Sequence, residues 1–180
     1  MFPPTATGML WGGVFTLLLL LSAVVDIRQR RIPNAGVVVL LALGLAYSLS
    51  TRPLAGALSA SLLGCLLGFG LFIAFWPMGL IGAGDVKLFA AIGVWLGPSA
   101  TWNAALITVI VGGVMAMYTL VRSRQVSSAM RRIALAVSTR SAAVLAPPPG
   151  DVAARSGHVP YAVAIATGAL VVAWLSPSLG

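Results

Sequence analysis

Long apolar runs alternate with short polar segments along the chain. A transmembrane helix needs about 17–25 predominantly apolar residues, and about six runs approach or reach this length. They are Met9–Val25, Ala35–Ser50, Leu54–Trp76, Val86–Gly97, Thr101–Val121 and Val159–Leu175. The pattern therefore predicts an all-α, polytopic integral membrane protein with about six transmembrane helices.

Two of these runs are short. Ala35–Ser50 is marginal, and Val86–Gly97 would span only about 18 Å at 1.5 Å per residue. Such a short helix either begins below the membrane surface or packs among its neighbours beside a wet cavity. The fourth run directly follows Asp85, so its shortness bears on the chemistry of the chain.

The composition agrees with a membrane protein. Hydrophobic residues make up 59% of the chain and charged residues 8%, whereas about a quarter of the residues in a soluble domain are charged. The net charge of +8 does not indicate nucleic acid binding, because the basic residues lie between apolar runs rather than among aromatic residues on one polar face. It fits a lipid bilayer with anionic headgroups.

The basic residues also predict an orientation. If segments 26–34, 77–87 and 122–158 are cytoplasmic, every Lys and Arg except Arg52 lies inside, in accord with the positive-inside rule. Both termini are then extracytoplasmic.

The first run has no positively charged segment before it, so we expect a retained span rather than a signal peptide. We expect one membrane-embedded domain, 1–180, whose basic loop 122–158 is either a headgroup-bound helix or a solvated loop.

Only three residues are acidic, and two of them occupy equivalent places. Asp26 ends the first span and Asp85 begins the fourth, so the topology puts both at the cytoplasmic face, whereas we expect Asp151 to be solvated in the long loop. Ionisable groups near the hydrocarbon are costly and are functional candidates. Two close carboxylates share a proton, so one activates a water while the other donates to a scissile carbonyl. This is the chemistry of an aspartic peptidase.

Both aspartates also have a structural interpretation. Asp26 would balance the arginines that follow it, and Asp85 would cap the fourth helix, since Asp is a favoured N-cap residue. The sequence offers no Ser–His–Asp set and no zinc cluster, because His158 is the only histidine. Cys65 is the only cysteine and we interpret it as a packing residue. We therefore expect neither a metal nor a cofactor.

The residues around Asp85 indicate how it is presented. Gly82 and Gly84 allow unusual backbone angles and let a substrate strand approach the main chain closely. Lys87 either interacts with a carboxylate of the site or substrate, or anchors the chain at the positive-inside face.

Three motifs resemble a known family. The stretch Gly-Ala-Gly-Asp-Val-Lys at 82–87 is similar to the G-x-G-D-x-K signature of type IV prepilin peptidases. Asp26, followed by Arg-Arg-Ile-Pro-Asn at 30–34, resembles the first-aspartate motif of that family, and the Pro-Tyr pair at 160–161 resembles its last-helix motif. The motifs occur in the order of the family and cover most of the chain.

The resemblance implies a bacterial inner-membrane aspartic endopeptidase that cuts the leader peptides of prepilins or pseudopilins just before their hydrophobic helix, at the cytoplasmic face. Asp26 and Asp85 would be catalytic. The supporting or substrate-binding residues would be Gly82, Gly84, Lys87, Pro33, Asn34, Pro160 and Tyr161.

The chain also departs from the larger family members, which carry a cytoplasmic insert with cysteine pairs and often N-methylate the new pilin terminus. Here the first loop is short and Cys65 stands alone, which counts against methyltransferase activity. In its size the chain resembles the short peptidases of Tad/Flp pilus systems. The alternatives are a non-catalytic assembly component of a pilus or secretion system, and a small transporter with a proton relay, although no internal repeat supports the latter.

Overall fold

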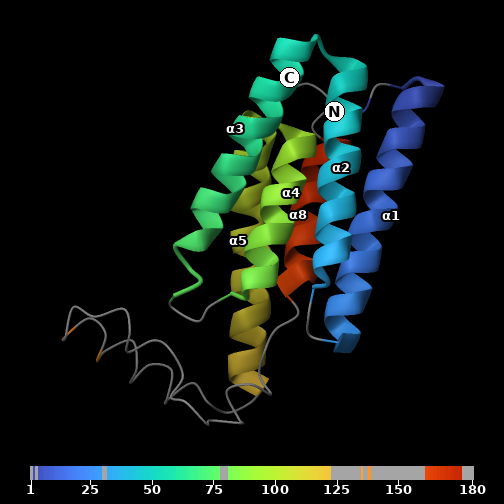
Figure 1. The fold of residues 1–180 in the computed structure, drawn as a ribbon. Coiled ribbons are helices and arrows are strands. Elements are labelled where there is room, and N and C mark those ends of the chain that lie inside the picture. The colour runs from blue at the N-terminus through green and yellow to red at the C-terminus, as the bar shows by residue number, and fades with distance from the viewer. Residues whose placement is uncertain are drawn as a thin grey trace.

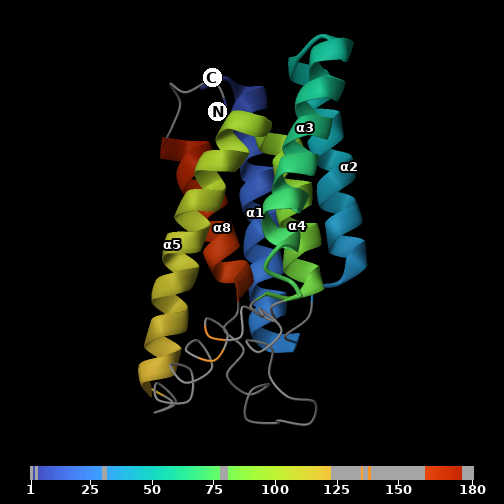
Figure 2. The same cartoon turned by 90° about the vertical axis from the view of Figure 1, so that its left-hand side faces the viewer.

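Six helices form an up-and-down bundle in the part of the chain that the computed structural model describes, namely residues 2, 4–29, 32–77, 81–122, 135, 138 and 161–175. Successive helices run in opposite directions (Figures 1 and 2). In chain order they are α1 (Ala6–Gln29), α2 (Asn34–Thr51), α3 (Leu54–Ile73), α4 (Ala83–Leu96), α5 (Pro98–Arg122) and α8 (Tyr161–Leu175).

Four of these helices are long and apolar enough to cross a membrane. They are α1, α2, α3 and the Pro98–Thr119 part of α5, and their mean hydropathy lies between 1.6 and 2.1. The large apolar side chains that α1, α3 and α5 leave exposed, such as Leu10, Leu62 and Ile110, have the surface expected against lipid. The prediction of an all-α, polytopic membrane protein is confirmed, while the number of spans and the side of the termini stay predictions.

The short helix α4 lies at the centre of the bundle. Every residue from Leu88 to Leu96 is buried, and α4 contacts α2, α3, α5 and α8. A helix that is apolar on all sides needs such surroundings. The short fourth run thus packs among its neighbours, while a wet cavity beside it and its depth in the membrane stay predictions.

Glycines let α3 and α4 approach each other closely. A Cβ atom on Gly64 would collide with the backbone oxygen of Gly93, and one on Gly68 would lie 2.8 Å from the backbone oxygen of Phe89. Small residues of this kind are typical of helix contacts inside membranes, where close backbone packing replaces the hydrophobic effect. The close contacts of Gly64 and Gly68 therefore fix the position of α4 against α3.

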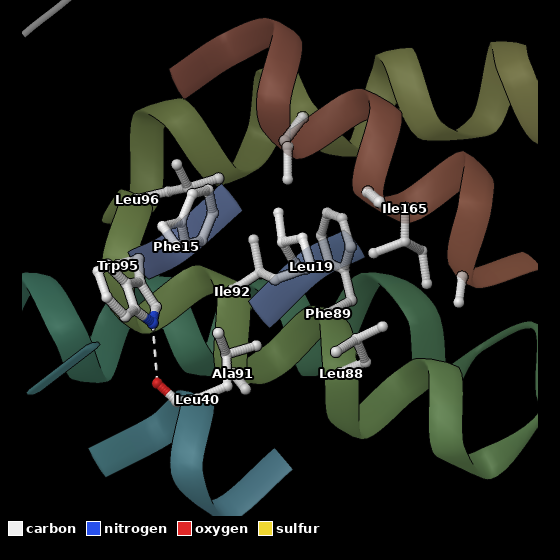
Figure 3. Packing of buried hydrophobic residues seen from close by; sticks show 14 of the residues in the cluster. Phe15, Leu19, Leu40, Leu88, Phe89, Ala91, Ile92, Trp95, Leu96 and Ile165 are labelled. Carbon is white, nitrogen blue, oxygen red and sulfur yellow. Dashed lines mark hydrogen bonds between the residues drawn. The ribbon is translucent and has the colours of Figure 1, made fainter. Parts of the chain in front are cut away.

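A buried aromatic side chain joins α4 to α1 and α2. Trp95 packs against Phe15 with ring centroids 5.0 Å apart, and its Nε1–H donates to the carbonyl oxygen of Leu40 over 2.8 Å. Figure 3 shows this hydrogen bond at one side of the core. Farther along the same core lie Leu19 of α1 and Ile165 of α8. The indole is fully buried and its one donor is satisfied, as a buried Trp requires.

Local chemistry explains most helix boundaries. Pro33 and Pro53 precede α2 and α3, and Pro98 opens α5, because proline is tolerated where a helix leaves its first N–H groups unpaired. Gly97 ends α4 with φ of 75°, a left-handed conformation that favours glycine. Its N–H donates to the carbonyl oxygen of Gly93 over 2.9 Å.

Two predicted boundaries at functional positions are wrong. The fourth helix begins at Ala83 rather than at Asp85, so Gly82 occupies the N-cap position and Asp85 lies in the first turn. The third helix ends at Ile73, and the chain continues in a turn that reaches Trp76. Both errors arise because an apolar pattern marks the buried part of a helix and not its hydrogen-bonded ends.

Several predictions fall outside the described residues. These are the solvated Asp151, the single histidine His158, the site residue Pro160 and almost all of the basic loop 122–158.

Candidate active site

Asp26 and Asp85 lie at the same end of the bundle. Asp26 sits in the last turn of α1 and Asp85 in the first turn of α4, and both helix ends lie toward the lower end of Figure 1. The side chains are 9% and 8% exposed. Acidic residues are almost never buried to this extent without a specific partner, so the contacts of each carboxylate matter.

The start of α8 holds the carboxylate of Asp26. The backbone N–H of Ala162 donates to Oδ2 of Asp26 over 3.2 Å. Ala162 lies in the first turn of α8, where a helix has N–H groups without an intrahelical acceptor and a partial positive charge. The amino end of α8 thus binds and orients an acidic group from the far end of the sequence.

The carboxylate of Asp85 is held by its own helix. The N–H of Gly82 donates to Oδ2 of Asp85 over 3.0 Å, which is one half of a capping box. The other oxygen, Oδ1, is buried and has no hydrogen-bond partner among the residues that the structure describes. A buried polar atom without a partner is costly, and Oδ1 is therefore the atom of this side chain whose hydrogen-bonding capacity is unused.

Asp85 lies close enough to Asp26 and to the phenol of Tyr161 for electrostatic interaction with each. Tyr161 is the first residue of α8 and directly precedes Ala162. Three separate helices therefore bring these groups into one cluster.

Lys87 and Asn34 meet at the surface of this end of the bundle. Nζ of Lys87 donates to Oδ1 of Asn34 over 3.3 Å, which links α4 to the first residue of α2. Pro33 precedes this helix, and its carbonyl oxygen accepts from the N–H of Gly36 over 3.0 Å. These residues tie the start of α2 to the helix that carries Asp85.

The two glycines before Asp85 are places of close contact. A Cβ on Gly82 would lie 3.1 Å from Oδ2 of Asp85, and one on Gly84 would lie 3.2 Å from Cβ of Ile32. The expected unusual backbone angles are wrong, because Gly82 has φ of −80° and Gly84 is helical. Close packing, rather than a strained backbone, favours glycine here.

The ring of Tyr161 rests on α5 beside α3. It packs edge-on to Phe72 with ring centroids 6.4 Å apart. A Cβ on Gly112 would lie 2.7 Å from its hydroxyl oxygen. The sequence motifs do not single out Phe72, Gly112 or Ala162, because these contacts join distant helices; the Gly-Gly pair in the apolar run of α5 is the one local signal.

A polytopic helical membrane protein with two buried carboxylates at one end of its bundle is the class that these observations define. The profile of the type IV leader peptidase family matches residues 13–117, which include both aspartates. The chain belongs to this family. The sequence resemblance to type IV prepilin peptidases is thereby confirmed, and α8 with Tyr161 lies outside the matched region.

Curated relatives carry the corresponding names. The chain is 32% identical over 116 residues to a prepilin leader peptidase/N-methyltransferase of Pectobacterium carotovorum subsp. carotovorum, covering 60% of this chain and 41% of the relative. It is 36% identical over 104 residues to one of Klebsiella pneumoniae, with 53% and 42% covered. The chain thus spans about two fifths of the length of the curated relatives it matches. No solved structure matches the chain.

Proposed function

We propose that this chain is an aspartic endopeptidase of the bacterial inner membrane. It removes the leader peptide from prepilin or pseudopilin substrates at the cytoplasmic face. The observation that carries the proposal is the buried pair of Asp26 and Asp85 at one end of a membrane-embedded bundle, within the region that matches the leader peptidase family. The names of the relatives support a prepilin-like substrate.

The contacts of the pair suit acid–base catalysis. Two close carboxylates disfavour simultaneous ionisation and titrate as a coupled pair. The ionised member takes a proton from a water that attacks the scissile carbonyl carbon, while the protonated member donates to the carbonyl oxygen. Backbone amides fix one oxygen of each carboxylate, and the hydrogen-bonding capacity of Oδ1 of Asp85 is left for the reacting groups.

The distribution of basic residues supports a cytoplasmic site. Arg28 and Arg122 occupy the last turns of α1 and α5, and Lys87 lies in the first turns of α4, all at the end that carries the aspartates. Arg52 lies between α2 and α3 at the other end. The positive-inside rule assigns the end with more basic residues to the cytoplasm.

The remaining motif residues support the pair. Gly82 and Gly84 permit close packing around Asp85, and the start of α8 places Tyr161 near Asp85 and the N–H of Ala162 against Asp26. Lys87 and Asn34 link α4 to α2, and Pro33 precedes α2 and accepts from its first turn. We assign Pro160 a supporting role from its motif alone.

Single replacements of the aspartates test the proposal. Asp26→Asn and Asp85→Asn keep the shape of the side chains but remove the shared proton, so each should slow leader removal by about 100-fold or more. The assay co-expresses the protein with a prepilin-type substrate and follows the shift from precursor to mature protein. Asp151→Asn is the control and should process normally. Near wild-type processing by either dyad variant would show that the pair is not catalytic.

A separate measurement concerns methylation. The curated relatives are also named N-methyltransferases, but we propose peptidase activity alone for this chain, because its only cysteine, Cys65, cannot form the cysteine pairs of the larger members. Mass spectrometry of the mature substrate should show a free amine at the new terminus. A mass increase of one methyl group that depends on this protein would contradict this part of the proposal.

A further inference from the structure

An apolar cavity of about 220 Å³ lies between α3, α5 and α8, at the end of the bundle that carries the aspartates. Phe72, Ile81 and Gly112 are buried and form its floor, and Tyr161 borders it from the start of α8. Apart from the Tyr161 hydroxyl, its lining side chains are hydrocarbon or hydrogen. Its chemistry therefore suits an apolar group.

Part of the rim of the cavity lies on the exposed lateral surface of the bundle. Phe75 and Val109 at its rim are 39% and 47% exposed, and Gly113 is exposed as well. Next to them on α5, the apolar side chains of Ile110 and Val114 are each 66% exposed. The opening thus lies on a surface that faces lipid in a membrane protein.

Tyr161 connects the cavity to the aspartates. Its ring borders the cavity, and its phenol lies close enough to Asp85 for electrostatic interaction. The backbone N–H of the next residue, Ala162, donates to Asp26. Gly112 leaves the space in which this ring lies. A group that enters from the lipid side and fills the cavity therefore lies beside the start of α8, the segment whose Ala162 N–H holds Asp26.

We infer that the cavity is a specificity pocket that binds one large apolar side chain from the first turns of the hydrophobic helix of the substrate. This inference rests on the proposed function. About 220 Å³ is smaller than the 300–1,000 Å³ typical of whole small-molecule ligands, so a single side chain is the fitting occupant. The substrate helix starts next to the scissile bond and reaches the enzyme through the bilayer, which brings its first side chains to the lateral opening.

The pocket sets the register of cleavage. An apolar side chain seated against Tyr161 fixes how far the substrate helix can slide along α5, and so fixes which peptide bond reaches the aspartates. Recognition through the helix does not depend on charge attraction, which a basic leader would not have to the basic residues Arg28 and Arg122 at this end.

The test obstructs the pocket with a larger enzyme side chain and then shortens the side chains of the substrate one at a time. Gly113→Leu places a side chain at the opening, where an added Cβ meets no atom within 4 Å. Gly70→Leu is the matched control, since it makes the same change at an exposed glycine of α3 with equally open surroundings. The probes are a prepilin-type substrate and a set of variants in which each residue in the first two turns of its apolar helix is changed to Ala.

Gly113→Leu is expected to slow cleavage of the unaltered substrate by about tenfold or more, and Gly70→Leu is expected to leave it unchanged. For one substrate position, Ala should restore most of the loss in Gly113→Leu while slowing cleavage by the wild-type enzyme. Val109→Ala, which widens the rim, should in turn accept Trp at that position better than the wild type does.

The outcomes separate this inference from the proposed function. If the wild type cleaves the substrate but Gly113→Leu slows every variant equally, or slows none more than Gly70→Leu does, the cavity does not recognise a substrate side chain and the inference is wrong. If the cavity only binds lipid without specificity, Gly113→Leu would slow every substrate variant equally. If the wild type cleaves no prepilin-type substrate, the proposed function fails as well.

Discussion

Backbone amides orient both aspartates, and they do so in different ways. Asp85 accepts from Gly82 within its own helix, a contact that forms as soon as α4 does. Asp26 accepts from Ala162, a contact that exists only when α8 has packed against α1. The site therefore depends on α8, although this helix lies outside the region that the family profile matches.

Gly112 offers a test of this dependence at a single residue. In Gly112→Ala the new methyl would lie 2.6 Å from Cε2 of Tyr161, so the ring at the start of α8 must shift. Because a displacement of about 1 Å near catalytic groups costs about 100-fold in rate, we expect leader cleavage to slow by about 10- to 100-fold. Gly13→Ala, whose Cβ meets nothing within 4 Å, is the control. Unchanged cleavage by Gly112→Ala would show that the position of Tyr161 does not matter.

Among the helices, α4 combines the main packing role with a functional role. It carries Asp85 in its first turn and is buried from Leu88 to its end. The close glycine contacts to α3 fix its height in the bundle, and the hydrogen bond from Trp95 to Leu40 ties it to α2. A shift of α4 along its axis would carry Asp85 away from Asp26, so packing and catalysis are coupled in this element.

Gly64→Ala tests that coupling. The added methyl would collide with the backbone oxygen of Gly93, and over-packing of this kind typically costs about 1–3 kcal/mol. We expect a lower midpoint of thermal unfolding in detergent and slower leader cleavage. Gly56→Ala in the same helix meets nothing within 4 Å and should be neutral or slightly stabilising, since Ala favours a helix over Gly by about 1 kcal/mol. Equal midpoints for the two variants would contradict the role of the α3–α4 contact.

The sequence predicts these elements better than it predicts their contacts. Apolar runs mark the long helices because a bilayer requires continuous hydrophobic stretches, and the placement of Asp26 and Asp85 at one face follows from the alternation of spans. The start of α4 at Ala83 was missed because its first turn contains Gly and Asp, which an apolar pattern does not count. The amide of Ala162 was also missed, since no side-chain pattern reports a backbone contact between distant helices.

Across the part of the molecule that the structure describes, the two ends of the bundle differ in their basic residues. The aspartate end carries Arg28, Lys87 and Arg122, and the opposite end carries Arg52. The lateral cavity opens near the aspartate end. A substrate whose apolar helix lies in the bilayer and whose leader extends into the cytoplasm would meet the cavity and the aspartates in that order, which requires the aspartate end to face the cytoplasm.

Cysteine labelling tests this orientation directly. Cys65 is the only cysteine and is only partly buried, so Cys65→Ser gives a background in which single cysteines can be placed at Arg28 and Arg52. In intact cells with a permeabilised outer membrane, a membrane-impermeant maleimide should label Arg52→Cys, while Arg28→Cys should react only after the inner membrane is opened. Leader cleavage by the Cys65→Ser parent serves as the control for folding. Labelling of Arg28→Cys in intact cells would place the aspartates on the outer face, where a cytoplasmic leader could not reach them.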